Sequence, residues 1–156
     1  MTVTTTGEKE TQSLGRRIGG ALGRGDVVAL IGELGTGKTV LARGIADGLS
    51  ASGYIASPTF TLIREYQGRV PMYHVDLFRL TPHEAAELGL EESMERSVTV
   101  IEWAERAPQL LRPPLLRVEL AFGKRADERI ITLSAEGDGP AAALATVSAA
   151  ATRTPT

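Results

Sequence analysis

The stretch LIGELGTGKTVLARGI, residues 30–45, places three glycines between an apolar run and a segment with helical periodicity. Residues 32–39 within it have the spacing G-x-x-x-x-G-K-T, which is the pattern of a phosphate-binding loop, or P-loop. The pattern follows VVALI, residues 27–31, which predicts a buried strand. It leads into residues 38–49, where apolar side chains at helical spacing predict a helix. Strand, glycine loop and helix in this order are the context in which the pattern binds phosphate.

The residue types of this loop suit the phosphates of a nucleotide. Glycine permits backbone conformations in which consecutive N–H groups turn toward one anion. The following helix adds the free N–H groups and the positive dipole end of its N-terminus. Lys38 supplies a point charge for the β- and γ-phosphates, and the Thr39 hydroxyl is a ligand for Mg²⁺. The predicted nucleotide-binding residues of the loop are Glu33, Leu34, Gly35, Thr36, Gly37, Lys38, Thr39 and Val40.

Two further predicted strands end in a carboxylate. Asp76 ends the apolar-leaning part of MYHVDLF, and Glu102 follows the more apolar run of VTVIEW. The carboxyl ends of parallel strands meet at one edge of a sheet, so we expect both acids to face the P-loop. Either acid can hold Mg²⁺, directly or through water, and the other can orient the attacking water. The predicted metal ligands are therefore Thr39, Asp76 and Glu102.

The rest of the chain predicts one α/β domain over residues 10–136. A helix is predicted over residues 10–22, with Thr11 as a candidate N-cap. TLIREY and VPMYHVDLF predict a hairpin, and LLRVELAF and ERIITLSAE predict a later one. Between the hairpins, PHEAAELGLEESMER predicts two short helices divided at Gly89. The predicted fold is a three-layer α/β fold of the P-loop NTPase type, with a mainly parallel central sheet and antiparallel hairpin strands at its edge.

The composition of both chain ends is typical of flexible segments. Residues 1–9 are polar, and residues 137–156 are biased toward Ala, Thr, Gly and Pro. We predict that both segments are flexible tails.

Composition excludes several classes of function. The 156 residues suffice for one domain with its own core, and a net charge of −2 argues against a broad nucleic-acid-binding surface. The chain has no cysteine, which excludes disulfides, thiol catalysis and cysteine-ligated zinc. No apolar run approaches the length of a membrane span, and the N-terminus has no signal-peptide pattern. We therefore expect a cytoplasmic protein with no membrane association.

Four segments together resemble a known family. GELGTGKT, SPTFTLIREY, HVDLFRL and IEWAER occur in this order at suitable spacing, and ETQSLGRRIG precedes them. They are similar to the TsaE (formerly YjeE) family, the small P-loop ATPases of bacterial tRNA threonylcarbamoyladenosine synthesis. The resemblance covers roughly residues 10–133. It is specific, because a general P-loop protein has no reason to carry S-P-T-F and I-E-W together.

The resemblance implies roles for individual residues. Asp76 matches the acid that assists Mg²⁺ binding, and Glu102 and Trp103 match a pair implicated in hydrolysis and nucleotide-dependent conformation. Thr59 lies in the S-P-T segment that matches a switch-like loop, and Thr11 of the first helix matches a nucleotide contact. The implied catalytic residues are Lys38, Asp76, Glu102 and Trp103, and the implied nucleotide contacts add Thr11 and Thr59 to the P-loop residues. Phe78 stands where the family often has Tyr, so a role for that hydroxyl does not carry over.

The resemblance also implies a partner-dependent function. The chain would bind ATP and Mg²⁺ and act as a conformational motor on a complex of TsaB and TsaD homologues, with weak hydrolysis alone and stronger hydrolysis beside them. Contact with tRNA would be indirect, through that complex.

Two other functions compete with the motor. A small-molecule kinase of the P-loop class is the main alternative, although no convincing Arg-bearing lid follows the Glu-Trp strand. A GTPase switch is the other, but the sequence contains no asparagine and therefore no guanine-reading N-K-x-D element.

Overall fold

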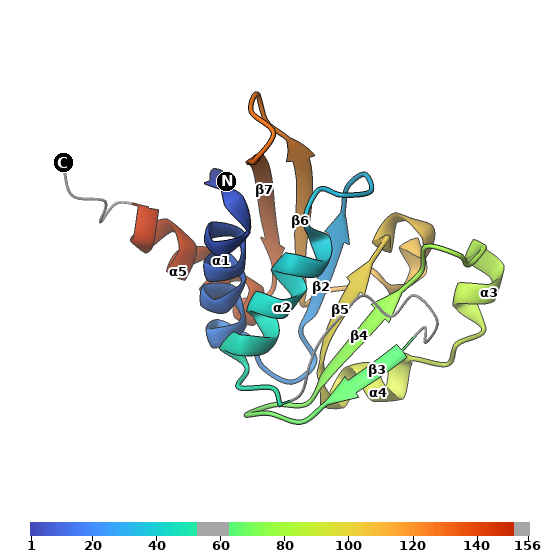
Figure 1. Cartoon of the computed structure of the whole chain (residues 1–156). Coiled ribbons are helices and arrows are strands. Elements are labelled where there is room, and N and C mark those ends of the chain that lie inside the picture. The colour runs from blue at the N-terminus through green and yellow to red at the C-terminus, as the bar shows by residue number, and fades with distance from the viewer. Residues whose placement is uncertain (53–62, 152–156) are drawn as a thin grey trace.

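The computed structural model describes residues 1–52 and 63–151 of the chain. Its elements in chain order are β1 (Thr2–Thr6), α1 (Gly7–Ala21), β2 (Val27–Ile31), α2 (Lys38–Gly48), β3 (Ile63–Tyr66), β4 (Met72–Asp76), α3 (Pro82–Ala86), α4 (Glu91–Arg96), β5 (Val98–Glu102), two 3₁₀ turns η1 (Ala104–Arg106) and η2 (Pro108–Leu110), β6 (Leu115–Phe122), β7 (Glu128–Glu136) and α5 (Asp138–Ala151). Figure 1 shows how they surround the sheet.

The sheet has the strand order β1-β7-β6-β2-β5-β4-β3. Strand β2 pairs in parallel with β5 and β6, and β5 pairs in parallel with β4. The remaining pairs, β1 with β7, β7 with β6 and β3 with β4, are antiparallel. The predicted mainly parallel centre with antiparallel hairpin strands toward the edges is therefore confirmed.

Helices cover both faces of this sheet because the central strands are apolar on both sides. Val28 and Leu30 of β2 face the core shared with α1, α2 and α5. Val27 and Ala29 face a second core beneath α3 and the 3₁₀ turns. The alternation follows from the two-residue period of a strand. The result is the predicted three-layer arrangement, with the α1–α2–α5 layer visible on one side of the sheet (Figure 1).

Helices α1 and α2 pack with their backbones in contact. A Cβ atom on Gly44 of α2 would overlap the backbone oxygen of Gln12 in α1. Only glycine fits at such a crossing. The close packing fixes the helix that begins at the P-loop against the first helix of the chain.

The predictions for the two chain ends were wrong. Strand β1 pairs with β7 from Thr2 opposite Thr132 to Thr6 opposite Glu128, so the N-terminal segment is part of the sheet. Its β-branched residues suit a strand, although their polarity suggested a tail. Helix α5 buries Ala143 and Val147 against the α1 side of the core. Alanine is the strongest helix former, which outweighed the low complexity of the segment. Of the predicted C-terminal tail, residues 152–156 lie outside the described residues.

The other predicted elements are present with small shifts at their ends. The first helix begins at Gly7 instead of residue 10, and Thr11 lies inside it, so the predicted N-cap was wrong. The two hairpins and the division between α3 and α4 are confirmed, and Gly89 has a left-handed φ of 63°. Among the described residues, no helix combines the length and the apolar character needed to cross a membrane.

Candidate functional site

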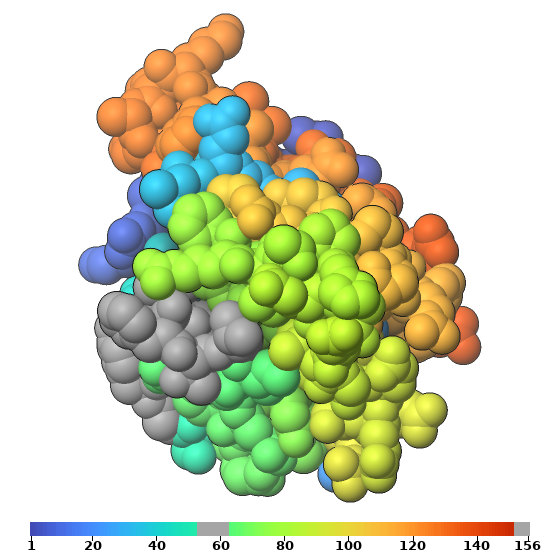
Figure 2. All heavy atoms as spheres, turned by 90° about the vertical axis from the view of Figure 1, so that its right-hand side faces the viewer, coloured from blue at the N-terminus to red at the C-terminus, as the bar shows by residue number. Residues whose placement is uncertain are grey.

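A cavity lies where the parallel strands β2, β5 and β4 end. It has a volume of about 540 Å³ and is bordered by the P-loop, the start of α1, the end of β5 and the β6–β7 hairpin. In Figure 2 the hairpin (orange) stands beside the P-loop (light blue) at one end of the molecule. The cavity is lined by Gly7, Glu8, Thr11, Leu34, Gly35, Thr36, Gly37, Lys38, Thr39, Val40, Asp76, Phe78, Arg79, Glu102, Trp103, Asp127 and Arg129.

The P-loop has the backbone that its glycines predict. Gly35 and Gly37 have φ values of 82° and 101°, in the left-handed region that favours glycine. The buried Thr36 hydroxyl donates to the Glu33 carbonyl at 2.7 Å and closes the turn. Helix α2 then starts at Lys38 without a side-chain cap, and its first turn lines the cavity. This arrangement leaves the backbone N–H groups of a helix N-terminus available to an anion.

Lys38 lies at the centre of the site and is only 5% exposed. Its Nζ donates to the carbonyls of Gly32 at 2.5 Å and Glu33 at 2.9 Å. The same nitrogen lies 4.1 Å from the centroid of the Trp103 ring. Burial lowers the pKa of Lys38, while the nearby charges of Glu102, Glu105 and Asp76 act in the opposite direction. Because the ammonium group is largely shielded from water, its attraction for a phosphate is stronger than at an open surface.

Glu102 ends β5 beside the start of α2. Its Oε1 accepts a hydrogen bond from the Thr39 hydroxyl at 3.0 Å, and its Oε2 lies 2.6 Å from His74 Nε2. His74 is fully buried on β4, and its Nδ1 has no hydrogen-bond partner among the described residues. An ionised carboxylate can only accept a hydrogen bond, so the proton of this contact lies on Nε2. His74 therefore donates to Glu102 and fixes the orientation of its carboxylate.

Asp76 lies directly opposite Glu102 in the β4–β5 pairing. Its Oδ1 accepts from the backbone N–H of Phe78 at 2.9 Å, which turns the chain at the end of β4. The strands bring both predicted acids to the cavity, as the sequence indicated.

The donors in this corner suit Mg²⁺. Thr39, Glu102 and Asp76 offer hydroxyl and carboxylate oxygens, which Mg²⁺ prefers. No cluster of three acidic or histidine side chains, anywhere in residues 1–52 and 63–151, could hold a metal ion by itself. An ion bound here would need oxygens from a phosphate and from water as well, which is the usual way in which Mg²⁺ is held.

Trp103 occupies an uncommon backbone conformation just after β5, with φ 59° and ψ 40°. Such left-handed geometry at a non-glycine residue is strained and occurs often at functional sites. It turns the indole toward Lys38, and the Phe78 ring packs on it with centroids 4.9 Å apart. Arg106 lies 5.6 Å from the centroids of both rings.

The other residues predicted to contact the nucleotide differ in whether they line the cavity. Leu34 lines the cavity at its edge and is 75% exposed. Glu33 does not line the cavity but contributes its carbonyl to Lys38. Thr11 is buried in α1, lines the cavity and shares a 2.8 Å hydrogen bond with the hydroxyl of Thr5. Thr59 lies outside the described residues.

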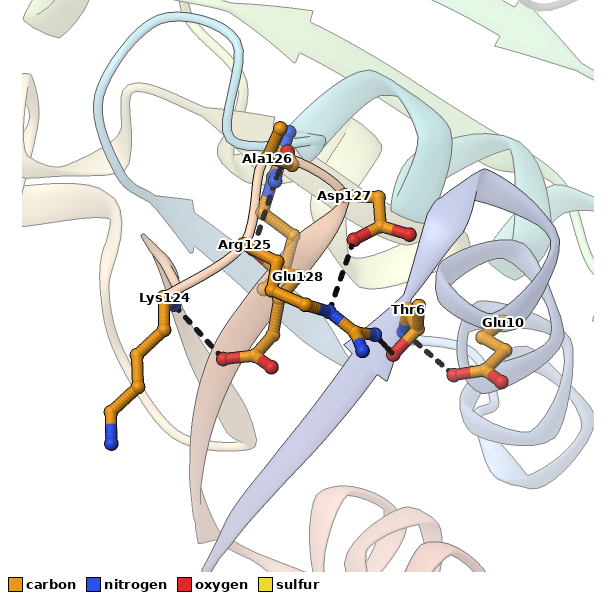
Figure 3. A network of polar contacts seen from close by, with 8 residues as sticks. Thr6, Glu10, Lys124, Arg125, Ala126, Asp127 and Glu128 are labelled. Carbon is orange, nitrogen blue, oxygen red and sulfur yellow. Dashed lines mark hydrogen bonds and ion pairs between the residues drawn. The ribbon is translucent and has the colours of Figure 1, made fainter.

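Sequence reasoning missed the wall formed by the β6–β7 hairpin. Asp127 and Arg129 line the cavity although they lie about 90 residues after the P-loop. Figure 3 shows the hairpin turn beside the start of α1. Arg125 contacts the Thr6 hydroxyl at 3.4 Å and Asp127 at 3.6 Å, and the N–H of Gly7 donates to the Asp127 carbonyl at 2.8 Å. No local motif indicates this wall, because it arises from strand pairing over a long separation.

The fold and the site together define a P-loop protein with a mixed sheet whose central strands are parallel. The family model described as "Threonylcarbamoyl adenosine biosynthesis protein TsaE" matches residues 5–131. The chain therefore belongs to the TsaE family.

Individual relatives agree with this assignment. The chain is 48% identical to the tRNA threonylcarbamoyladenosine biosynthesis protein TsaE of a Nostoc species over 107 residues, which cover 65% of this chain and 66% of that protein. It is 42% identical to TsaE of Mycobacterium bovis over 144 residues, which cover 85% and 86%. Among solved structures, that of Bacillus subtilis YdiB superposes with a TM-score of 0.82 at 30% identity and covers 97% of this chain and 95% of that one.

Proposed function

We propose that this protein binds and hydrolyses ATP as a subunit of the machinery that makes threonylcarbamoyladenosine in tRNA. In this proposal it acts as a conformational motor on a complex of TsaB and TsaD homologues and does not itself transfer the threonylcarbamoyl group. The single observation that carries the proposal is the convergence of Lys38, Thr39 and Glu102 on one cavity at the P-loop. Family membership supplies the tRNA modification context.

The cavity suits a nucleotide in size and in chemistry. Its volume of about 540 Å³ lies within the usual range for small-molecule sites. The triphosphate would lie against the P-loop amides and Lys38. The nucleoside would extend toward Gly7, Glu8 and Thr11 at the start of α1, where the cavity continues. The lack of asparagine, and hence of an N-K-x-D element, favours adenine over guanine.

Magnesium would be held at the same corner by Thr39 and Glu102, with Asp76 close by. A bound Mg²⁺ neutralises charge that develops on the phosphate oxygens during transfer. Glu102 receives hydrogen bonds at both oxygens, so its carboxylate keeps one orientation in the site. Lys38 exchanges its bonds to the loop carbonyls for bonds to phosphate oxygens when the nucleotide binds.

Exposed apolar side chains around the cavity support a partner that docks over its opening. Leu34 is 75% exposed, Phe122 49% and Phe78 40%. Large apolar groups gathered near one opening are typical of interaction surfaces, and aromatic residues are enriched there. A partner that favours the hydrolysing conformation of the site would raise the rate by shifting a population of conformers. With a net charge of −2, tRNA would be reached through the partner complex.

Calorimetry and association measurements test the proposal with a matched pair of variants. The native chain should bind Mg-ATP and associate with TsaB and TsaD in an ATP-sensitive way. Lys38→Ala should lose at least about tenfold in ATP affinity because a charge-assisted phosphate contact is removed. Lys9→Ala, at an exposed position of α1, should match the native chain. Hydrolysis should be weak alone and rise when TsaB and TsaD are added.

Two results would contradict this function. The first is hydrolysis at the same rate with and without TsaB and TsaD, which would remove the motor. The second is fast phosphate transfer from ATP to a small metabolite without any partner, which would support the kinase alternative.

A further inference from the structure

We infer that Arg129 of β7 is a positioning residue that holds the P-loop in its phosphate-binding shape. The inference deepens the proposed function and rests on it, since it assigns the support of the same loop. Arg129 Nε donates to the Thr36 carbonyl at 3.2 Å, and its NH2 group donates to the Gly35 carbonyl at 3.3 Å. Both carbonyls belong to the middle of the loop.

The chemistry of a P-loop explains why these carbonyls need a partner. When consecutive backbone N–H groups point toward a phosphate, the carbonyls of the same peptide units point away from it. Lys38 takes the carbonyls of residues 32 and 33 from inside the loop. Arg129, from β7, donates to the carbonyls of residues 35 and 36. A planar guanidinium can serve two neighbouring carbonyls at once, whereas an ammonium group lacks this fixed fork.

Arg129 is itself held rigidly. Its NH1 group donates to the carbonyls of Ala126 at 2.8 Å and Glu128 at 2.9 Å, and its guanidinium lies 5.0 Å from the Phe122 ring centroid. Every nitrogen of the guanidinium therefore donates to a backbone carbonyl. Within the described part of the chain, Arg129 forms no ion pair with a carboxylate, so its positive charge at the cavity wall is not neutralised by a bound acid.

The hairpin that carries Arg129 is also tied to the start of α1. Arg125 and Asp127 contact Thr6 and Gly7 there, as Figure 3 shows for the labelled residues around Thr6. The phosphate end and the α1 end of the cavity therefore share one wall. Among the described residues, Arg129 is the only side chain of this hairpin that donates to the P-loop backbone, which makes it the connection to test.

Hydrogen exchange in the nucleotide-free protein tests the positioning role directly. Arg129→Met keeps most of the apolar stem and removes all five donors. We expect the amide of Thr36, which donates to the Glu33 carbonyl at 3.3 Å, to exchange about tenfold faster, because bonds from a charged donor to two loop carbonyls are lost. The exchange of β2 and β5 should stay as in the native chain. The affinity for Mg-ADP, measured by calorimetry, should fall by about tenfold as well.

Two further variants test whether the shape of the Arg129 guanidinium matters more than its charge, and whether any arginine of the hairpin would have the same effect. Arg129→Lys keeps the charge but lacks the fork, and we expect loop exchange close to that of Arg129→Met. Arg125→Met is the matched control on the same hairpin, whose side chain contacts Thr6 and Asp127 and not the P-loop. It should leave the exchange of the Thr36 amide unchanged.

Two outcomes would overturn the inference. They are unchanged loop exchange in Arg129→Met and loop exchange in Arg129→Lys equal to that of the native chain. If Mg-ADP binding weakens in Arg129→Met while loop exchange stays unchanged, Arg129 touches the nucleotide and does not position the loop. The exchange measurement needs no ligand, so it tests the role of Arg129 even if the native chain does not bind Mg-ADP. A failure of the native chain to bind Mg-ADP would contradict the proposed function and not the role of Arg129.

Discussion

The two ends of the parallel sheet both bury polar groups, but they use them differently. At the amino end, Asp26 is 5% exposed and accepts a hydrogen bond from the N–H of Gly23 at 2.8 Å. Ser97 is fully buried beside it and donates to the Ser93 carbonyl at 2.8 Å. At the carboxyl end, Lys38, Glu102 and Asp76 line one cavity. The first set closes loops onto the sheet, and the second faces a space that a ligand can enter.

The difference teaches that burial of an ionisable group does not by itself mark a functional site. Asp26 and Glu102 are both acids at strand ends with less than a tenth of their surface exposed. The two acids differ in the groups around them. Glu102 is hydrogen-bonded to Thr39 of the P-loop and to His74, and Asp76 lies opposite it on the neighbouring strand β4. When several ionisable groups line one cavity, they can bind a charged ligand together. An isolated acid at the other end can only stabilise or destabilise the fold.

The largest effect should follow from Glu102→Gln. Glutamine keeps the shape but has one acceptor oxygen, whereas Thr39 and His74 both donate to the carboxylate. We expect hydrolysis in the presence of TsaB and TsaD to fall by about 100-fold or more, because the charge that serves Mg²⁺ or the attacking water is lost. Single-turnover hydrolysis measures this effect. The control is Asp26→Asn at the opposite end, which should hydrolyse ATP at the native rate, and equal losses in both variants would end the distinction between the two ends.

A smaller effect should follow from changes at His74. His74→Leu fills the buried space but cannot donate to Glu102, and we expect the kcat for ATP to fall by about tenfold with little change in KM. His74→Gln can place an amide N–H near the position of Nε2 and should recover most of the activity. Thermal unfolding of both variants checks the fold. If the leucine variant keeps the native kcat, or if the glutamine variant is no better than leucine, His74 does not orient the carboxylate.

Much of this architecture could be predicted from the sequence, because the decisive signals are local. VVALI followed by GELGTGKT specified β2, the P-loop and α2, and strand-end carboxylates placed Asp76 and Glu102 at the correct edge. The predictions of flexible chain ends were wrong because they gave more weight to composition than to secondary-structure propensity and strand pairing. In those segments, tertiary contacts decide the structure.

The missed parts of the site depend on contacts between distant segments. Arg129 reaches the P-loop only because β7 returns next to β6, which lies beside β2. His74 meets Glu102 because β4 and β5 pair in parallel at a particular register. The alternation of strand residues could have indicated that His74 and Asp76 share a face. Nothing in the local sequence could indicate the partner of Arg129.

The smallest expected effect concerns the acid at the amino end. Burial raises the pKa of Asp26, and the hydrogen bond from Gly23 offsets part of that rise. The start of α5 contributes to the burial, since a Cβ atom on Gly139 would overlap the Asp26 carboxylate. Helix α5, which was predicted from the sequence to be part of a flexible tail, therefore helps to bury this acid.

The sign of the resulting pH dependence follows from proton linkage. With the pKa raised in the folded state, that state binds the proton more tightly than the unfolded chain, so stability falls as the pH rises through the folded pKa of Asp26. Asp26→Asn removes this titration. The free energy of unfolding of Asp26→Asn minus that of the native chain should therefore increase between pH 3.5 and pH 8. Urea unfolding of both proteins across this range measures the difference, and any constant offset from the new amide cancels in its slope. If this difference in unfolding free energy stays constant or decreases with pH, burial does not disfavour the ionised form of Asp26. The contrast between the two ends of the sheet would then rest only on the cavity at the carboxyl end.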